Sequence, residues 1–340
     1  MSIVTDCISE RRDEGCVKLA NELAGHLKKL DTLTAVLACG SAAAPRNADV
    51  CIPANRLFLS AGLFRYLRTR REPVLYIPFS SNTPAAVFRT WMLSVYSRRR
   101  LTVLFAMRYP MSRLTGLLLK LSGARVAVLS AESAAYFRQQ GVETLYLKTG
   151  VDTARFVPVD PERKRQLREK YGLPQDEKIL LHVGHMKKSR NVEALLWLTE
   201  EAHAVLVCST RTVPEPELRA ALESSPAVSV IDRYVEHIEE IYQLADIYLF
   251  PVTQLHNCID VPLSALEAAA CGLPVIATAY GELKALHGKE GFYLLESCDE
   301  KTAKQAFAKV CAAQGCGGRE AVLEYDWSRA AQTLFSAMRD

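Results

Sequence analysis

The segment 260–278 constrains the fold more than any other part of the chain. Its small and apolar residues predict a short helix, with Asp260 as the expected cap and Pro262 suited to the first turn. Gly272 then fits the position that follows a helix C-terminus, and Val275–Thr278 predicts a buried strand. This order of helix, glycine and strand is typical of an α/β unit with a parallel sheet.

One carboxylate, Glu267, lies within this helix among Leu263, Leu266, Ala269 and Ala270. If the side chain faces water, a single glutamate needs no further explanation. If it is buried, it is unfavourable without a polar partner, and a bound polar ligand is one natural explanation. Glu267 is therefore the first candidate site residue.

This segment resembles the donor-site signature of retaining glycosyltransferases of family 4. There, a Glu-x7-Glu pair precedes an Ala-rich turn, a glycine and a Pro-Val-Ile-Ala-like strand. Glu267 matches the second glutamate, which the resemblance implies accepts hydrogen bonds from the ribose hydroxyls of a nucleotide-sugar donor. Ile259 stands where the first glutamate would be. Asp260, one residue later, is a candidate for sugar contact and catalysis, and capping of the helix is the alternative account.

A second motif follows the predicted strand that ends at Gly184. In the resembled family this position reads Gly-Arg-x-x-x-x-Lys-Gly, and its two cations bind the pyrophosphate of the donor. Gly184 matches, His185 replaces the arginine, Arg190 replaces the lysine and Asn191 replaces the second glycine. Arg190 offers phosphate a bidentate fork, whereas His185 would act as a neutral donor or when protonated. Lys188 is an alternative cation in the same loop.

Further candidates lie at the ends of other predicted elements. Tyr234 follows a strand and is a candidate for base contact, while His256 and Asn257 are candidates for sugar contact or members of an ordinary polar loop. Gly15 enters a predicted helix, where free backbone amides could meet a phosphate or sugar, and a plain tight turn is the alternative. Arg108 follows another strand and is a candidate for acceptor or phosphate contact.

Alternating apolar and amphipathic segments predict an α/β protein with two doubly wound, Rossmann-like domains. The resemblance implies the GT-B fold, in which these domains face each other across a cleft. The sequence 150–158 resembles the family's segment at the start of the second domain. We therefore expect an acceptor-binding domain over 1–150, a donor-binding domain over 151–323, and a C-terminal segment, 324–340, whose helix crosses back to the first domain.

Six strands are predicted in each half of the chain. In the first half they are 2–5, 33–38, 73–77, 101–106, 125–129 and 144–147. In the second half they are 179–183, 204–208, 228–231, 247–250, 275–278 and 292–294.

The composition is that of a globular protein, with 340 residues, 49% hydrophobic and 24% charged. No apolar run reaches the roughly 20 residues that span a bilayer, and the N-terminus lacks a signal-peptide pattern, so we expect a cytoplasmic protein. The ten cysteines form no paired ligand sets, and Cys311 and Cys316 are the closest pair. No Asp-x-Asp motif occurs, which predicts a reaction without a metal ion or other cofactor.

Charge is distributed unevenly. Residues 1–150 contain 21 Lys/Arg and 10 Asp/Glu, a net of +11, and the remaining 21 Lys/Arg and 28 Asp/Glu give a net of −7. The basic residues of the first half cluster, between apolar and aromatic residues, at Arg65, Arg68, Arg70, Arg71, Arg98, Arg99, Arg100, Arg108 and Arg113. Such clusters favour contact with an anionic membrane surface or a phosphorylated acceptor, with a solvated face as the alternative. No nucleic-acid motif accompanies them.

No histidine lies between residues 27 and 181, where an inverting enzyme would carry its general base, and this favours retention. The resemblance implies a UDP- or GDP-linked sugar donor, whose leaving phosphate takes the acceptor proton. Glycans, lipid-linked glycans and small metabolites all stay open as acceptors. Two alternatives remain, a catalytically reduced binding or scaffold subunit and a nucleotide-sugar epimerase on the same fold.

Overall fold

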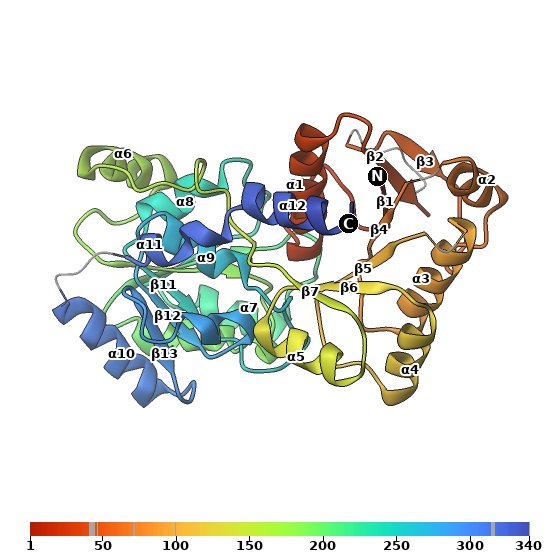
Figure 1. Ribbon diagram of the computed structural model, residues 1–340. Coiled ribbons are helices and arrows are strands. Elements are labelled where there is room, and N and C mark those ends of the chain that lie inside the picture. The colour runs from red at the N-terminus through yellow and green to blue at the C-terminus, as the bar shows by residue number, and fades with distance from the viewer. Residues whose placement is uncertain (41–44, 46, 71, 99, 314–316, 340) are drawn as a thin grey trace. The chain divides into compact units, whose positions relative to one another are not determined.

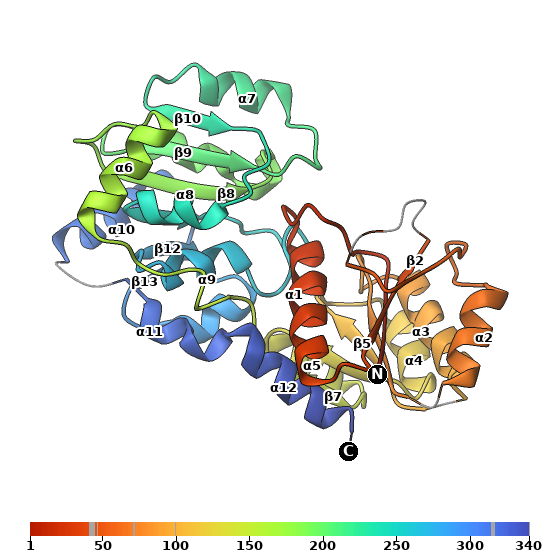
Figure 2. The ribbon, with the colours of Figure 1, turned by 90° about the horizontal axis from the view of Figure 1, so that it is seen from above.

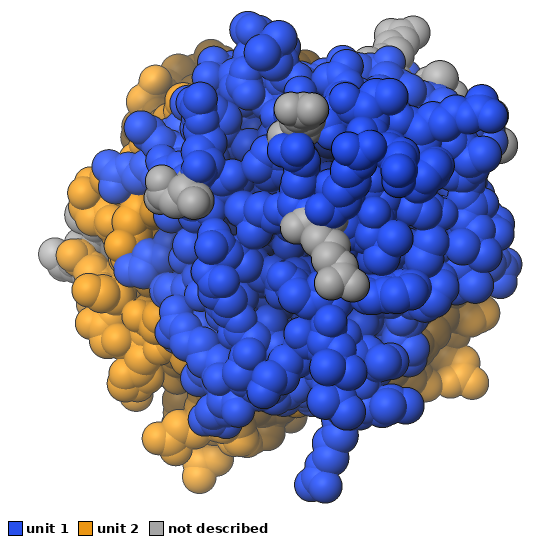
Figure 3. Space-filling view, turned by 45° about the vertical axis from the view of Figure 1, so that its right-hand side comes forward, with its two compact units in different colours: residues 1–149, 259–261, 327–340 blue, residues 150–258, 262–326 orange. Residues whose placement is uncertain are grey.

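The computed structural model describes residues 1–40, 45, 47–70, 72–98, 100–313 and 317–339. The chain forms two compact units, which are coloured separately in Figure 3. Unit 1 contains Met1–Thr149, Ile259–Val261 and Trp327–Asp340, and unit 2 contains Gly150–Cys258 and Pro262–Asp326. Three residues of the charge and cysteine patterns lie outside the described residues, namely Arg71, Arg99 and Cys316.

A parallel sheet with the order β3-β2-β1-β4-β5-β6-β7 forms the centre of unit 1 (Figure 1). Its strands are β1 Ser2–Thr5, β2 Ala35–Cys39, β3 Val50–Ile52, β4 Val74–Ile77, β5 Thr102–Ala106, β6 Arg125–Val128 and β7 Thr144–Tyr146. Its helices are α1 Gly15–Leu30, α2 Ala61–Thr69, α3 Pro84–Tyr96, α4 Arg113–Leu121, α5 Ala131–Gln139 and α12 Trp327–Ala337.

Helices cover both faces of this sheet. Figures 1 and 2 show α2, α3 and α4 on one face and α1 and α12 on the other. Strand residues that alternate along the chain, such as Val74 and Tyr76 of β4, join one core cluster with Leu63 of α2, Leu93 of α3 and Leu119 of α4. This two-faced burial explains why the strands are continuous apolar runs in the sequence.

Strand β3 is absent from the sequence prediction. It is only Val50–Ile52, it pairs with β2 alone and it lies at the edge of the sheet. Because a three-residue edge strand buries little surface, its apolar pattern is too short to distinguish from a loop. The six strands that were predicted in this half are present, with ends that differ by up to two residues.

Unit 2 has a second parallel sheet, in the order β10-β9-β8-β11-β12-β13. Its strands are β8 Ile179–Gly184, β9 His203–Cys208, β10 Val228–Ile231, β11 Ile247–Phe250, β12 Val275–Thr278 and β13 Phe292–Leu295. Its α-helices are α6 Pro161–Tyr171, α7 Pro216–Glu223, α8 Ile238–Leu244, α9 Leu263–Ala270, α10 Glu300–Ala312 and α11 Arg319–Val322. Its 3-10 helices are η1 Lys188–Arg190, η2 Val192–Leu198, η3 Gly281–Leu286 and η4 Leu323–Tyr325.

Both sheets reverse their strand order at one internal position. In unit 1 the reversal lies between β1 and β4, and in unit 2 it lies between β8 and β11. The loops that leave the carboxyl ends of two such strands diverge, which creates the crevice where doubly wound proteins bind ligands. The predicted doubly wound α/β architecture is confirmed, and it marks these two positions as the first places to examine for a site.

The C-terminal helix α12 belongs to unit 1, as the fold prediction required, and it packs along α1. Arg125 of β6 donates from Nη1 to the carbonyl oxygen of Ala337 at 3.2 Å. The segment 324–326, in contrast, stays with unit 2, where Thr153 Oγ1 donates to the Asp326 carboxylate at 2.6 Å. The boundary therefore falls at 326–327 rather than at 323–324.

No helix in the described part of the chain is both long enough and apolar enough to cross a membrane.

Candidate functional site

Glu267 is buried in α9, with 3% of its surface exposed. Its carboxylate lies close enough to Tyr242 of α8 and Tyr248 of β11 for its charge to act on both hydroxyls. Burial, and then the charge of Glu267, raise the pKa of the Tyr242 hydroxyl well above its ordinary value. Of the two alternatives that the sequence left open for Glu267, burial is the one that the structure shows, and a water-facing glutamate is excluded. A carboxylate buried at this depth requires polar partners.

Asp260 does not cap this helix, and that part of the sequence interpretation is wrong. Helix α9 begins at Leu263 with Pro262 as its N-cap residue, and no side chain caps it. Asp260 belongs to unit 1 instead, where its backbone N–H donates to the carbonyl oxygen of Met107 at 2.9 Å. The segment Ile259–Val261, which directly precedes Pro262, therefore belongs to unit 1 and not to the helix.

The Asp260 carboxyl is buried beside α5. It hydrogen-bonds to Ser133, and its Oδ2 has no hydrogen-bond partner in the part of the chain that the structure describes. Burial raises the pKa of this carboxyl to about 8, although Ser133 and Arg108 both lower it, and Glu132 raises it further. Asp260 is therefore a buried acid of unit 1, and its catalytic role stays a prediction.

Gly184 ends β8 at a position where a side chain would not fit. A Cβ there would lie 2.9 Å from Nε2 of His182 and 3.4 Å from Nη1 of Arg190. The imidazole of His182 cannot move aside easily, because it is buried and its Nδ1 lies 2.8 Å from the carbonyl oxygen of Leu249. Glycine at this position thus lets the end of β8 approach the arginine closely.

Arg190 and Asn257 tie the two loops at the unit 2 reversal together. Arg190 Nη2 donates to the carbonyl oxygen of Asn257, and Asn257 Nδ2 donates to the carbonyl oxygen of Ser189 at 2.6 Å. Tyr280 holds the next residue, since its hydroxyl lies 2.9 Å from the carbonyl oxygen of Cys258. The structure therefore brings together Gly184, Arg190 and Asn257, which were predicted separately.

The other cations of the loop point to different partners. Lys188 Nζ forms an exposed ion pair with Glu217 of α7 at 2.7 Å, and this hydrogen bond raises the pKa of the lysine. His185 Nδ1 lies 2.7 Å from Oγ1 of Thr212. Of the three predicted cations, Arg190 has the position best suited to a ligand at the reversal. The site roles of Lys188 and His185 stay predictions.

Asn191 adopts a left-handed backbone conformation, with φ of 55° and ψ of 36°. Glycine and asparagine are the residues that most readily accept this conformation. The replacement of the family's second glycine by Asn191 therefore preserves the turn between η1 and η2.

Two weaker candidates lie at the edges of this site. His256 is exposed and has a positive φ of 70° in the loop after β11. Tyr234 is partly buried and follows β10, the edge strand, which β9 separates from β8. Their contacts with sugar and base stay predictions.

The candidates of unit 1 gather at its own reversal. Gly15 is the first residue of α1, and a Cβ there would lie 3.4 Å from Cδ1 of Ile259. Arg108 Nη1 donates to the carbonyl oxygen of Phe79 at 3.2 Å and lies 3.5 Å from Sγ of Cys16. The structure thus places Arg108 beside the helix that Gly15 begins, as the sequence alone could not show.

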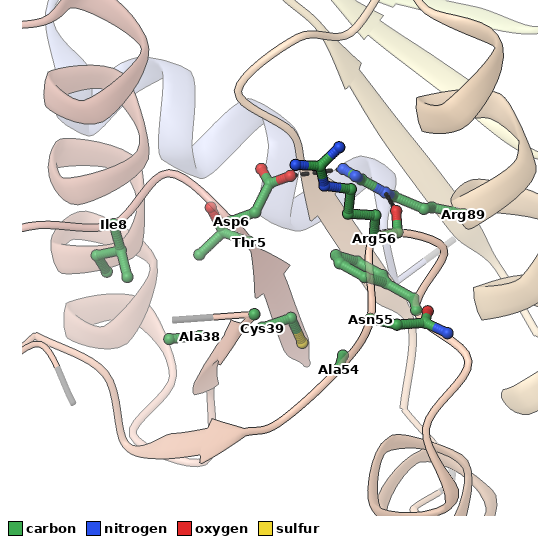
Figure 4. Close-up of a pocket in the computed structure, with 11 residues that line it drawn as sticks. Thr5, Asp6, Ile8, Ala38, Cys39, Ala54, Asn55, Arg56 and Arg89 are labelled. Carbon is green, nitrogen blue, oxygen red and sulfur yellow. Dashed lines mark hydrogen bonds and ion pairs between the residues drawn. The ribbon is translucent and has the colours of Figure 1, made fainter. Parts of the chain in front are cut away.

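A pocket of about 280 Å³ at the carboxyl ends of β1 and β2 was missed by the sequence analysis (Figure 4). Asp6, which directly follows β1, accepts hydrogen bonds from the Phe79 N–H at 2.7 Å and from Arg89 Nη1 at 2.6 Å. Asn55 and Arg56 line the opposite wall. The usable signal was an aspartate placed directly after the strand that begins the sheet reversal.

The second half of the chain matches a known family. The family model for glycosyl transferases group 1 matches residues 177–312, which include the loop of Arg190 and the helix of Glu267. This segment is thus similar to the group 1 glycosyltransferases. A curated relative, D-inositol 3-phosphate glycosyltransferase of Geodermatophilus obscurus, is 28% identical over 57% of this chain and 46% of its own length. The chain thus aligns with about half of that relative.

Solved glycosyltransferase structures share the fold of the whole chain. Sucrose-phosphate synthase of Thermosynechococcus elongatus has a TM-score of 0.73 at 18% identity, covering 100% of this chain and 98% of the other. Anabaena HepE, solved in complex with UDP, has a TM-score of 0.70 at 16% identity, covering 100% of this chain and 95% of the other. These neighbours identify the GT-B fold.

Proposed function

We propose that this protein is a retaining glycosyltransferase. It transfers a sugar from a UDP- or GDP-linked donor to an acceptor hydroxyl, without a metal ion. One observation carries the proposal: unit 2 holds both a buried carboxylate, Glu267, and a cation, Arg190, in the two segments that resemble the family's donor-site motifs. Arg190 joins the loops that follow β8 and β11, where the strand order of the sheet reverses. The structural neighbour that was solved with UDP supports the nucleotide class.

Unit 2 offers one residue suited to bind the ribose of the donor and another suited to bind its diphosphate. Glu267 supplies a fixed carboxylate that accepts hydrogen bonds from ribose hydroxyls, and such charge-assisted bonds are about twice as strong as neutral ones. Arg190 supplies the bidentate donor for a phosphate, and Asn257 holds its guanidinium in place. His185, in the same loop, would add a further hydrogen-bond donor. Protein cations thereby take over the neutralisation that a divalent ion provides in other transferases.

The reaction then depends on charge that develops on the leaving diphosphate. Arg190 stabilises this charge as the bond to the sugar breaks, and the leaving phosphate accepts the proton of the attacking hydroxyl on the same face. The protein contributes orientation and electrostatic stabilisation, which together account for large rate gains without a general base.

On the acceptor side, the pocket of unit 1 suits a small polyol or phosphorylated headgroup. The Asp6 carboxylate accepts hydrogen bonds from hydroxyls, Asn55 offers an amide, and the exposed Arg56 favours an anionic substituent. The positive excess of residues 1–150 attracts such an acceptor. We place the reaction in the cytoplasm, at the surface of an anionic membrane that carries a glycan or lipid-linked acceptor.

The test is a thermal-shift panel of UDP, GDP, ADP and their common sugar conjugates, because a ligand that binds only the folded state raises the melting temperature. We expect one nucleotide series to stabilise the wild type, with the stabilisation lost in Arg190→Ala. Arg219→Ala is the matched control, since Arg219 pairs with Glu223 and Asp232 on the surface of the same unit. EDTA should leave the shift unchanged.

A second step separates the alternatives. Transfer to an acceptor with an unchanged anomeric configuration, read by NMR, supports the retaining enzyme. Nucleotide binding without transfer or hydrolysis would indicate a scaffold subunit, which the buried Ile259 in place of the first glutamate would then explain. Release of a rearranged free sugar without any acceptor would indicate an epimerase.

A further inference from the structure

Helix α4 exposes a complete apolar stripe. Leu114, Leu117, Leu118 and Leu121 are 67%, 53%, 45% and 71% exposed, and their spacing of i, i+3, i+4 and i+7 places them on one side of the helix. The opposite side is buried against the sheet, with Leu119 in the core. The helix therefore has two apolar sides, and only one of them serves the fold.

The neighbouring helix α3 continues this surface. Phe88, Trp91 and Val95 are 37%, 45% and 40% exposed, and the rings of Phe88 and Trp91 lie 6.0 Å apart between centroids. Helices α3 and α4 pack side by side on the same face of the unit 1 sheet (Figures 1 and 2). We call the surface formed by these three residues and the four leucines of α4 the α3–α4 face. Clustered exposed apolar side chains of this kind mark an interaction site.

The charge around the α3–α4 face has one sign. Residues 73–131 contain no aspartate or glutamate, and they contain eight arginines and lysines. Arg98, Arg113 and Lys120 are exposed at the ends of the two helices, and no ion pair joins them to a carboxylate in the described ranges. Apolar side chains bordered by unpaired cations are the pattern of a surface that lies on anionic lipid.

A second copy of the chain fits this surface less well. A two-fold contact would bring the same cations of both copies together, and like charges that face each other across an interface repel. An anionic bilayer instead offers phosphates to the cations and an acyl boundary to the leucines. The long arginine and lysine side chains can reach the phosphates while the apolar centre is immersed.

We propose that the α3–α4 face docks unit 1 on an anionic lipid surface. Leu114, Leu117, Leu118 and Leu121 enter the boundary between headgroups and acyl chains together with Trp91, while Arg98, Arg113 and Lys120 contact lipid phosphates. Only the purpose of this docking, which is to bring unit 1 to a lipid-borne acceptor, rests on the proposed function. The docking itself stands on the exposed side chains.

The experiment is co-sedimentation of the full chain with vesicles of phosphatidylcholine alone or mixed with an equal part of phosphatidylglycerol. We expect binding to the mixed vesicles and little binding to phosphatidylcholine alone. The double variant Leu117→Ser, Leu121→Ser should weaken binding by roughly ten-fold per leucine removed. Its matched control is Val213→Ser with Leu255→Ser, because both are exposed apolar residues of unit 2, and this pair should bind like the wild type.

The electrostatic part is tested by Arg113→Gln with Lys120→Gln, which should weaken binding about five-fold for each cation removed. Lys301→Gln with Lys309→Gln, two exposed lysines of α10 in unit 2, is the control. Equal binding of all variants, or equal binding to both kinds of vesicle, would overturn the proposal. So would a concentration-dependent dimer that the leucine variants abolish, in the absence of vesicle binding.

The nucleotide thermal shift, measured on the same variants, separates the two proposals. Vesicle binding without a nucleotide shift would leave the docking intact and remove the donor proposal. A nucleotide shift without vesicle binding would do the reverse.

Discussion

The two units have the same strand order around their reversals, yet those reversals differ in chemistry. In unit 2, Arg190 joins the loops after β8 and β11, and Glu267 lies buried in the helix that follows. In unit 1, Asp6 accepts from the loop after β4 and from Arg89, and it lines an open pocket. The shared sheet therefore fixes only where a ligand binds, while the loops decide which ligand.

The two halves of the chain also differ in net charge. The first 150 residues carry a net of +11 and the rest a net of −7, although the unit with the negative total holds the cationic loop. The loop of Arg190 is thus a local cationic site in the negatively charged part of the chain, whereas the positive charge of residues 1–150 is carried by helices and loops alike.

Exchanging the two key carboxylates for amides should separate donor from acceptor binding. Glu267→Gln removes charged hydrogen bonds to the donor and should raise its dissociation constant roughly 10- to 100-fold, measured by calorimetry. Asp6→Asn should leave that constant unchanged and lower the rate of transfer. Glu282→Gln is the control, since Glu282 is also buried in unit 2 but accepts from Tyr325 at 2.7 Å. Equal effects of Glu267→Gln and Glu282→Gln on nucleotide affinity would contradict the assignment.

The two units should lose stability at opposite ends of the pH range. Burial raises the pKa of Asp260 in unit 1 to about 8, so its contribution to stability is full below its unfolded pKa and is lost as pH rises through 8. Burial lowers the pKa of His182 in unit 2 to about 4, so its contribution is full above pH 6.5 and is lost as pH falls through 4.

Asp260→Asn should therefore raise the melting temperature at alkaline pH by roughly 5 °C and change little in acid. His182→Gln should act at the acid end alone. Trp197 reports on unit 2, and Trp91 and Trp327 report on unit 1, so fluorescence of single-tryptophan variants can assign each change. An alkaline effect of Asp260→Asn that appears only at Trp197 would refute the placement of Asp260 in unit 1.

Two glycines should respond in opposite directions to the same substitution. Gly184→Ala forces a Cβ against His182 and should cost about 1–3 kcal/mol in the free energy of unfolding. Gly25→Ala lies in α1 with open space around its Cβ, and it should gain about 0.5–1 kcal/mol. Chemical denaturation measures both. If Gly184→Ala left the free energy of unfolding unchanged, the end of β8 would be packed more loosely than the distance to His182 indicates.

The smallest effect concerns the left-handed residue in the cationic loop. Asn191→Gly should change the free energy of unfolding by only a few tenths of a kcal/mol, whereas Asn191→Ala should cost about 1 kcal/mol. Nucleotide affinity should follow the same order, because this turn positions Arg190. A large loss of affinity in Asn191→Gly would mean that the asparagine side chain itself contacts the donor.

The sequence predicts well what a short segment decides by itself. The helix around Glu267, the glycine at the end of β8 and every strand of the two sheets except β3 each follow from a local sequence pattern. The location of Asp260 does not, because it depends on which unit the segment Ile259–Val261 packs with. The pocket of unit 1 escaped prediction for the same reason, since its walls come from β1, β2, the segment 54–58 and α3.

The chain passes between the units four times, at 149–150, 258–259, 261–262 and 326–327. Synthesis runs from the N-terminus, so the sheet of unit 1 is complete long before the ribosome has made α12, which packs along α1. Until then, the nascent first unit lacks a helix and a three-residue segment that only the finished chain provides. Unit 1 therefore completes its folding after unit 2 is made, and a fragment that ends at residue 149 should need a separately supplied α12 peptide to reach full stability.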